Sequence, residues 1–282
     1  MNVSTREALL DLYDAPDPER PGRTIPGYDR DHAERTTRIV MKMAQTMGLA
    51  PSWHEDLEAT ALLHDLGRAG MDPELFGAIF GPAQEKGLPV RIAELRARYP
   101  NVTETQAPGF YLDLIRPLLA EKGLEVNDRL IDHVAMRMDF KGRLRRILTE
   151  RAAALHSVGI SVKPWMEQVM LCYYYPGGME GADDDVRLMG MLLVACENFE
   201  AYNNRRRGSD YYGRKGDQLR AVFTTLDGFE KRGLVSREVL AGLLDLTASG
   251  ELDGVVNEAR GLTPDEPLPE DDRAFLRESA RA

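Results

Sequence analysis

The sequence predicts an all-α fold, a bundle of packed helices. Apolar residues recur every three or four positions through most of residues 30–245, which is typical of amphipathic helices. No segment shows the sustained alternation of apolar and polar residues that indicates a half-buried strand. Gly48 and Gly67 directly follow two of the periodic segments, and glycine is common where helices end.

Three parts of the chain differ in composition. Residues 1–29 combine a short helix, expected over 1–13, with a lead-in rich in proline and glycine. Residues 30–245 carry the helical pattern and form the main domain. Residues 246–282 are charged and contain several prolines, so we expect a loosely held C-terminal tail.

Composition excludes some partners. The formal net charge of −10 argues against non-specific nucleic-acid binding, which needs a basic face. The longest apolar run, MGMLLVAC, is too short to cross a bilayer, so no membrane partner is expected. Cys172 and Cys196 lie in apolar stretches, which indicates buried free thiols in a reducing compartment. We therefore expect a soluble cytoplasmic protein.

The first helix of the main domain is expected over 30–47. Its apolar stripe includes Ile39, Val40 and Met43, and His32 continues that stripe toward the N-terminus. Asp29 or Asp31 is placed to cap the start of the helix. His32 should therefore face the interior.

A second helix is expected over 53–66. Leu57, Ala61 and His64 share one of its faces, so His64 should also point inward, with Asp65 beside it at the helix end. Arg68 follows in the turn after Gly67.

Further helices are expected over 127–140, 143–156, from Pro164 onward, and over 186–207. The first half of the last one is apolar on all sides, which indicates burial. Glu197 ends that buried half. A buried carboxylate is costly unless it is paired, hydrogen-bonded or bound to a metal.

The helices expected over 30–47, 53–66 and 186–207 each contribute inward polar groups, and these groups could bind one metal ion together. His32, His64, Asp65 and Glu197 would offer imidazole and carboxylate ligands, which suit Fe, Mn, Zn or Ni. Such an ion polarises a phosphoryl oxygen and activates water, and Asp65 could orient or deprotonate that water. Arg68, Lys215 and the arginine run 205–207 could neutralise phosphate oxygens.

Several segments, in the same order, resemble the HD-GYP domains of the HD superfamily. They are ALLHDLGRAGMDPELFG (61–77), YYPGGMEG (174–181) and RLMGMLLVACENFEAYNNRRR (187–207). The resemblance covers about residues 30–240 and implies an HD-domain helical bundle. It implies a metal-dependent phosphohydrolase or phosphodiesterase acting on cyclic di-GMP or another nucleotide phosphoester, with Asp65 and Arg68 as catalytic residues.

The chain departs from that family pattern in ways that affect the site. The family's metal aspartate in the last helix aligns with Glu197, and its lysine after the His-Asp pair aligns with Arg68. The His-His-Glu triplet is missing, and tyrosines 173–175 stand near its place. The resemblance then implies one divalent metal ion rather than several. We assign Arg68, Tyr175 and Lys215 to substrate binding.

Other readings stay open. His32 and His64 could be satisfied core histidines, and Glu197 could pair with an arginine. We expect His156 to be structural, and His133 and His54 to lie at helix surfaces. The alternative function is a degenerate, inactive HD-GYP-like module for signalling or ligand binding, with a protein signalling partner. Iron-dependent oxygen chemistry is a weaker possibility.

Overall fold

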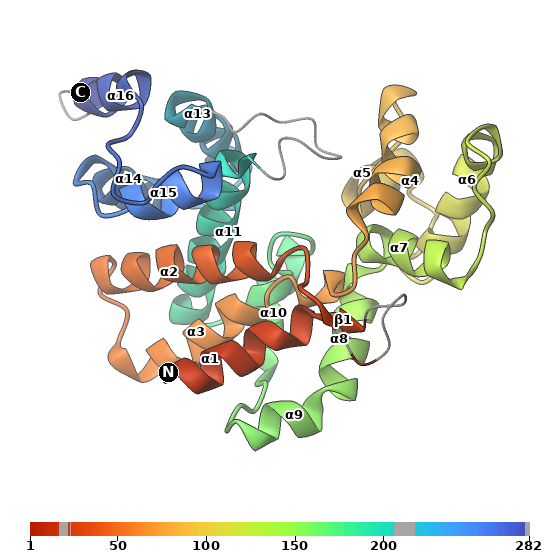
Figure 1. Cartoon of the computed structure of the whole chain (residues 1–282), viewed down its shortest axis with the longest axis horizontal. Helices are drawn as coiled ribbons and strands as arrows, with labels where there is room; N and C mark the ends of the chain where they lie inside the picture. Colours follow the sequence, from red (N-terminus) through yellow and green to blue (C-terminus); the bar gives the residue numbers. More distant parts are fainter. Residues whose placement is uncertain (17–21, 23, 206–217, 280–282) are drawn as a thin grey trace.

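The structure, a computed structural model, describes residues 1–16, 22, 24–205 and 218–279 (Figure 1). Their regular secondary structure is almost entirely helical, which confirms the all-α class. Their extended segments are β1 (Ala15–Pro16) and β2 (Thr24–Ile25), a two-residue antiparallel pair in the lead-in. In the described ranges, no helix combines the length and apolar character needed to span a bilayer.

Four helices form the centre of the molecule. They are α2 (Arg30–Thr46), α3 (His54–Leu63), α10 (Pro164–Leu171) and α11 (Asp184–Asn203). Helix α2 packs against both α3 and α11, and α10 contacts both α3 and α11 (Figure 1). Segments far apart in the sequence therefore meet in one bundle of four helices, in which each packs against two others.

The two helices that carry the predicted histidines end differently. Helix α2 matches its expected range to within one residue, and Gly48 follows it with a left-handed φ of 72°. Helix α3 is shorter than expected because 3-10 turns flank it, η2 (Pro51–Trp53) before it and η3 (Leu66–Arg68) after it. Asp65 and Arg68 therefore lie on a tight turn beyond the helix.

A second group of helices stands beside the central four (Figure 1). Its members are α4 (Pro73–Glu85), α5 (Ile92–Arg98), α6 (Ala107–Glu121) and α7 (Asp128–Met138). They enclose an apolar cluster of their own around Phe76, Phe80 and Tyr111. Helices α8 (Phe140–Glu150) and α9 (Ala152–Ser157) lead back to α10, and η4 (Pro176–Met179) joins α10 to α11.

His133 corrects one expectation about surface histidines. It lies on α7 with only 2% of its surface exposed, although charged residues flank it in the sequence. Its Nδ1 atom donates to the carbonyl of Arg129 at 2.7 Å, and its Nε2 atom accepts from the backbone N–H of Asp72 at 2.9 Å. Burial lowers the pKa of His133 below 6.5. His54 is half-buried at the start of α3.

The C-terminal segment corrects another expectation. It forms α15 (Asp253–Arg260), which packs against α2 and α11. It also forms α16 (Glu270–Ser279), which packs against α13 (Leu219–Glu230) and α14 (Arg237–Ala248). Leu268 and Leu276 are buried in the same apolar cluster as α11. The prediction of a loosely held tail is wrong because apolar residues spaced among its charges, Leu268 and Leu276 included, are buried in that cluster. The N-terminal helix α1 (Val3–Leu10) packs against α3.

Candidate metal centre

The four residues predicted to bind a metal lie together in the interior. One donor atom from each of His32, His64, Asp65 and Glu197 falls within 4.8 Å of the others. All four side chains are buried. His32 comes from α2, His64 and Asp65 from the end of α3, and Glu197 from α11. Such a group can hold a metal ion because imidazole nitrogens and carboxylate oxygens are its usual protein ligands.

The His32 ring is oriented by a residue that the sequence analysis missed. Its Nδ1 atom donates a hydrogen bond to Glu200. Glu200 is buried and lies on α11, one turn after Glu197. Arg35 and Asn204 both donate to Glu200, at 2.7 Å and 3.0 Å. With its proton on Nδ1, His32 presents the lone pair of Nε2 toward the cluster. A carboxylate behind a histidine is the usual outer contact of a metal-binding imidazole.

The His64 ring is oriented by the backbone of its own helix. Its Nδ1 atom donates to the carbonyl of Ala61 at 2.7 Å, which leaves the lone pair on Nε2. That Nε2 atom is buried and makes no hydrogen bond to any of the residues that the structure describes. A buried polar atom of this kind needs a partner, and a metal ion is one that fits.

Asp65 lies between the two imidazoles. Its Oδ2 atom is 3.6 Å from Nε2 of His32 and 3.8 Å from Nε2 of His64. Two ligands bound to one ion by bonds of about 2.1 Å lie roughly 3.0–3.4 Å apart, depending on the coordination geometry. The Asp65 oxygen is thus close to the distance from each imidazole nitrogen that a single transition-metal ion requires.

Arg68 has a different environment from the one expected. It is buried, donates to Asp65, and lies 3.1 Å from Oδ2 of Asp29. Asp29 occupies the position before α2, but its carboxylate makes no capping hydrogen bond and faces Arg68 instead. The predicted capping role of Asp29 is therefore wrong. The contacts of Arg68 give it a part in holding Asp65, and its contact with phosphate stays a prediction.

The charge of this region suits a divalent cation. Four buried carboxylates, those of Asp29, Asp65, Glu197 and Glu200, lie close to the guanidinium groups of Arg35 and Arg68. Burying several carboxylates together is unfavourable, and a cation held by the cluster would offset part of that cost.

Tyr13 lies near the same negative charges. Its hydroxyl is fully buried and donates to the carbonyl of Leu62 at 2.8 Å. Burial, and then the charges of Asp65 and Asp29, raise the pKa of Tyr13 well above its usual value of 10.0. The N-terminal segment is therefore part of the wall of the site. The sequence offered no signal for this, because Tyr13 reaches the site only through the packing of α1 on α3.

The structure places Tyr175 elsewhere. Tyr175 lines a groove of about 440 Å³ together with Arg96, Lys141 and the turn at 176–178, and none of the four cluster residues lines it. Burial, helped by the charge of Glu104, raises the pKa of Tyr175 to about 12. Its substrate-binding role stays a prediction. Lys215, Arg206 and Arg207 lie outside the described residues.

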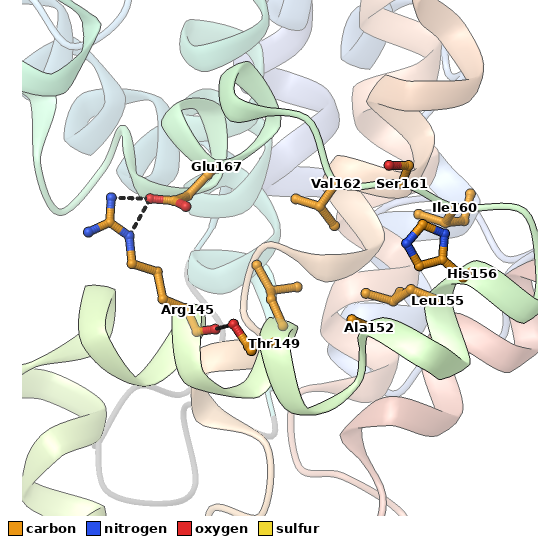
Figure 2. Close-up of a pocket in the computed structure, with 10 residues that line it drawn as sticks. Arg145, Thr149, Ala152, Leu155, His156, Ile160, Ser161, Val162 and Glu167 are labelled. Carbon is orange, nitrogen blue, oxygen red and sulfur yellow. Dashed lines mark hydrogen bonds and ion pairs between the residues drawn. The ribbon is translucent and has the colours of Figure 1, made fainter.

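His156 also lies away from the cluster. Figure 2 shows it at a groove between α8, α9 and the start of α10, with Leu155, Ile160 and Val162 as apolar neighbours. It is exposed, so it offers nothing to the metal centre. Cys172 and Cys196 are buried free thiols, as predicted.

No known protein family, curated protein or solved structure matches this chain. The function of the protein must therefore be inferred from its own residues.

Proposed function

We propose that this protein is a metal-dependent phosphohydrolase or phosphodiesterase of the HD superfamily that acts on a nucleotide phosphoester. The observation that carries the proposal is the buried cluster of His32, His64, Asp65 and Glu197, whose donor atoms lie within 4.8 Å of one another. The resemblance of residues 61–77 to the HD-GYP signature supports it, and makes cyclic di-GMP a candidate substrate.

The chain's own residues have separable roles in this proposal. His32, His64, Asp65 and Glu197 would hold one divalent ion, of Fe, Mn, Zn or Ni. When bound, that ion would supply Lewis acidity toward a phosphoryl oxygen and water. Glu200 and the carbonyl of Ala61 hold the two imidazoles in the tautomers that present Nε2 inward.

Arg68 and Asp65 form the part of the site that would act on the reacting groups. Arg68 sets the position of the Asp65 carboxylate and adds positive charge where a phosphate would bind. Asp65 would accept a proton from water during attack on phosphorus.

The test begins with metal content. Protein purified without chelator or nickel resin is analysed by plasma mass spectrometry beside a His64→Ala, Asp65→Ala double variant. We expect near-stoichiometric metal that is lost in the double variant and retained in His156→Ala, which changes an exposed histidine outside the cluster. Hydrolysis of nucleotide phosphodiesters, cyclic di-GMP included, is then assayed with the loaded protein.

A second candidate function is a non-catalytic signalling or ligand-binding module. The tyrosines that stand near the place of the missing triplet favour it, because two of them are engaged in packing. Tyr174 stacks on Phe140 with ring centroids 4.3 Å apart, and Tyr173 packs against Tyr174 and Phe229. Absence of metal after reconstitution, combined with binding of a cyclic dinucleotide without hydrolysis, would select this function over the first.

A further inference from the structure

Arg143 forms hydrogen bonds to the turn that follows the His64-Asp65 pair. Its Nη1 atom donates to the carbonyl of Gly67 and its Nη2 atom donates to the carbonyl of Ala69, the latter at 2.9 Å. These carbonyls belong to the residues on either side of Arg68. Arg143 is buried on α8, which is separated from α3 by more than seventy residues of chain.

The guanidinium is itself held in place. Its Nε and Nη2 atoms donate to the two carboxylate oxygens of Asp132 at 3.0 Å and 2.7 Å, a two-point ion pair between α8 and α7. Burial raises the pKa of Asp132, but the hydrogen bonds and charge of Arg143 outweigh it, and the pKa is lowered overall. Arg143 thus links Asp132 on one side to the turn on the other.

Phe140 and His133, which neighbour Arg143 and Asp132, contact other residues of the segment 66–72. The Phe140 ring lies so close to Gly67 that an added Cβ there would be 2.5 Å from Cε2. At the far end, His133 accepts a hydrogen bond from the backbone N–H of Asp72. The α7–α8 hairpin therefore contacts the 66–72 segment at its start, middle and end.

We propose that Arg143 is a positioning residue of the metal centre, fixing the turn that carries Asp65 and Arg68. The inference rests on the proposed function only for its effect on metal affinity. The four ligands come from three helices, and Asp65 lies just beyond the end of its own, so its placement depends on what holds the turn. Loss of a contact that orients a metal ligand typically weakens affinity about 10–100-fold.

Arg146 offers a matched control. It also pairs with Asp132, at 3.1 Å, but it is exposed and makes no contact with the 66–69 turn among the contacts the structure describes. Arg143→Met and Arg146→Met therefore remove the same kind of side chain from the same carboxylate. Only Arg143→Met also removes the hydrogen bonds to the carbonyls of Gly67 and Ala69.

Two measurements test the proposal. Hydrogen exchange of the amides of Arg68 and Ala69, which bond within the turn, reports its opening whether or not metal binds. Titration with Mn²⁺ alone reports the affinity of the centre. We expect faster exchange at these amides and about 10–100-fold weaker Mn²⁺ binding in Arg143→Met, with neither change in Arg146→Met.

Exchange that is unchanged in Arg143→Met, or equally fast in both variants, would overturn the positioning role. If the wild-type protein binds no metal, the proposed function fails while the exchange comparison still decides about the turn. Should Arg143→Met not fold, Asp132→Asn provides the same comparison, since it leaves the guanidinium present but loosens its anchor. In that variant we expect the same amides to exchange faster, and unaltered exchange would again overturn the proposal.

Discussion

His32 on α2 donates a hydrogen bond from Nδ1 to Glu200 on α11, across 168 positions of sequence. Glu197, whose carboxylate belongs to the metal cluster, lies one turn before Glu200 on α11. One helix therefore supplies both a candidate ligand and the group that orients another ligand. This arrangement explains why two glutamates three residues apart are both buried.

Glu200→Gln should weaken metal binding by about 10–100-fold while the fold is retained. A glutamine has nearly the same shape, but its neutral amide is a weaker acceptor for the His32 Nδ1 proton and no longer attracts Arg35. Isothermal titration with Mn²⁺ measures the change. Glu258→Gln is the control, because Glu258 pairs with Arg38 on α2 outside the cluster. Equal affinities in wild type and Glu200→Gln would show that His32 needs no carboxylate.

Gly67→Ala should lower the free energy of unfolding by about 1–3 kcal/mol, because the new methyl group would overlap the Phe140 ring. Chemical denaturation measures the loss. A second change, Phe140→Leu, should restore part of it by removing the overlapping ring edge. Gly109→Ala is the control, since nothing lies within 4 Å of the position of its Cβ on α6. A Gly67→Ala protein as stable as wild type would contradict the packing of α8 on the turn.

His133 should make stability fall on acidification. Its pKa is lowered in the folded protein because it is buried as the neutral form, so the unfolded chain binds the extra proton more readily. Its stabilising contribution is complete above about pH 6.5 and is lost as the pH falls below that value, by at most about 1.4 kcal/mol per pH unit.

Urea denaturation between pH 7.5 and 5 gives this slope. His133→Gln should remove it, whereas His156→Gln should leave it, because His156 is exposed. Parallel slopes for wild type and His133→Gln would show that the histidine does not titrate differently on folding.

Asp272→Ala should destabilise the protein by about 3–5 kcal/mol, although it lies in the charged C-terminal segment. Its Oδ1 atom accepts from the backbone N–H of Leu219 at 2.7 Å, and its Oδ2 atom pairs with Arg260. Removing the carboxylate deprives the buried N–H of Leu219 of its acceptor and takes from Arg260 one of its partners. Thermal unfolding of this variant beside Asp271→Ala, whose side chain is exposed, measures the difference. Similar melting temperatures for the two variants would mean that α16 is not part of the cooperative unit.

Local patterns were enough to predict the helices that build the centre. The apolar stripe of 30–47 predicted both the helix and the inward direction of His32, because helical spacing ties each residue to a face. The same reasoning placed His64 inside, and the burial of 186–197 predicted that Glu197 would need a partner. The grouping of these residues followed from one chemical requirement, that inward polar groups be satisfied together.

Local patterns failed where a residue's surroundings come from distant parts of the chain. His133 has charged sequence neighbours, yet α4 packs against α7, and the backbone N–H of Asp72, just before α4, donates to His133. The segment around Leu276 looks like a solvated tail, yet α16 packs against α13 and α14, and Leu276 is buried. Composition describes a segment's average tendency, whereas burial depends on what packs against it.

The sequence by itself determined the helical class, the inward faces of α2, α3 and α11, and the set of residues able to bind a metal. Only the tertiary structure decided that Glu200 orients His32 and that Arg68, paired with Asp29, donates to Asp65. The same is true of the hydrogen bonds from Arg143 to the turn after Asp65. The physical reason is that periodicity defines the direction of a side chain relative to its own helix. Which groups lie opposite it depends on how helices distant in sequence pack together.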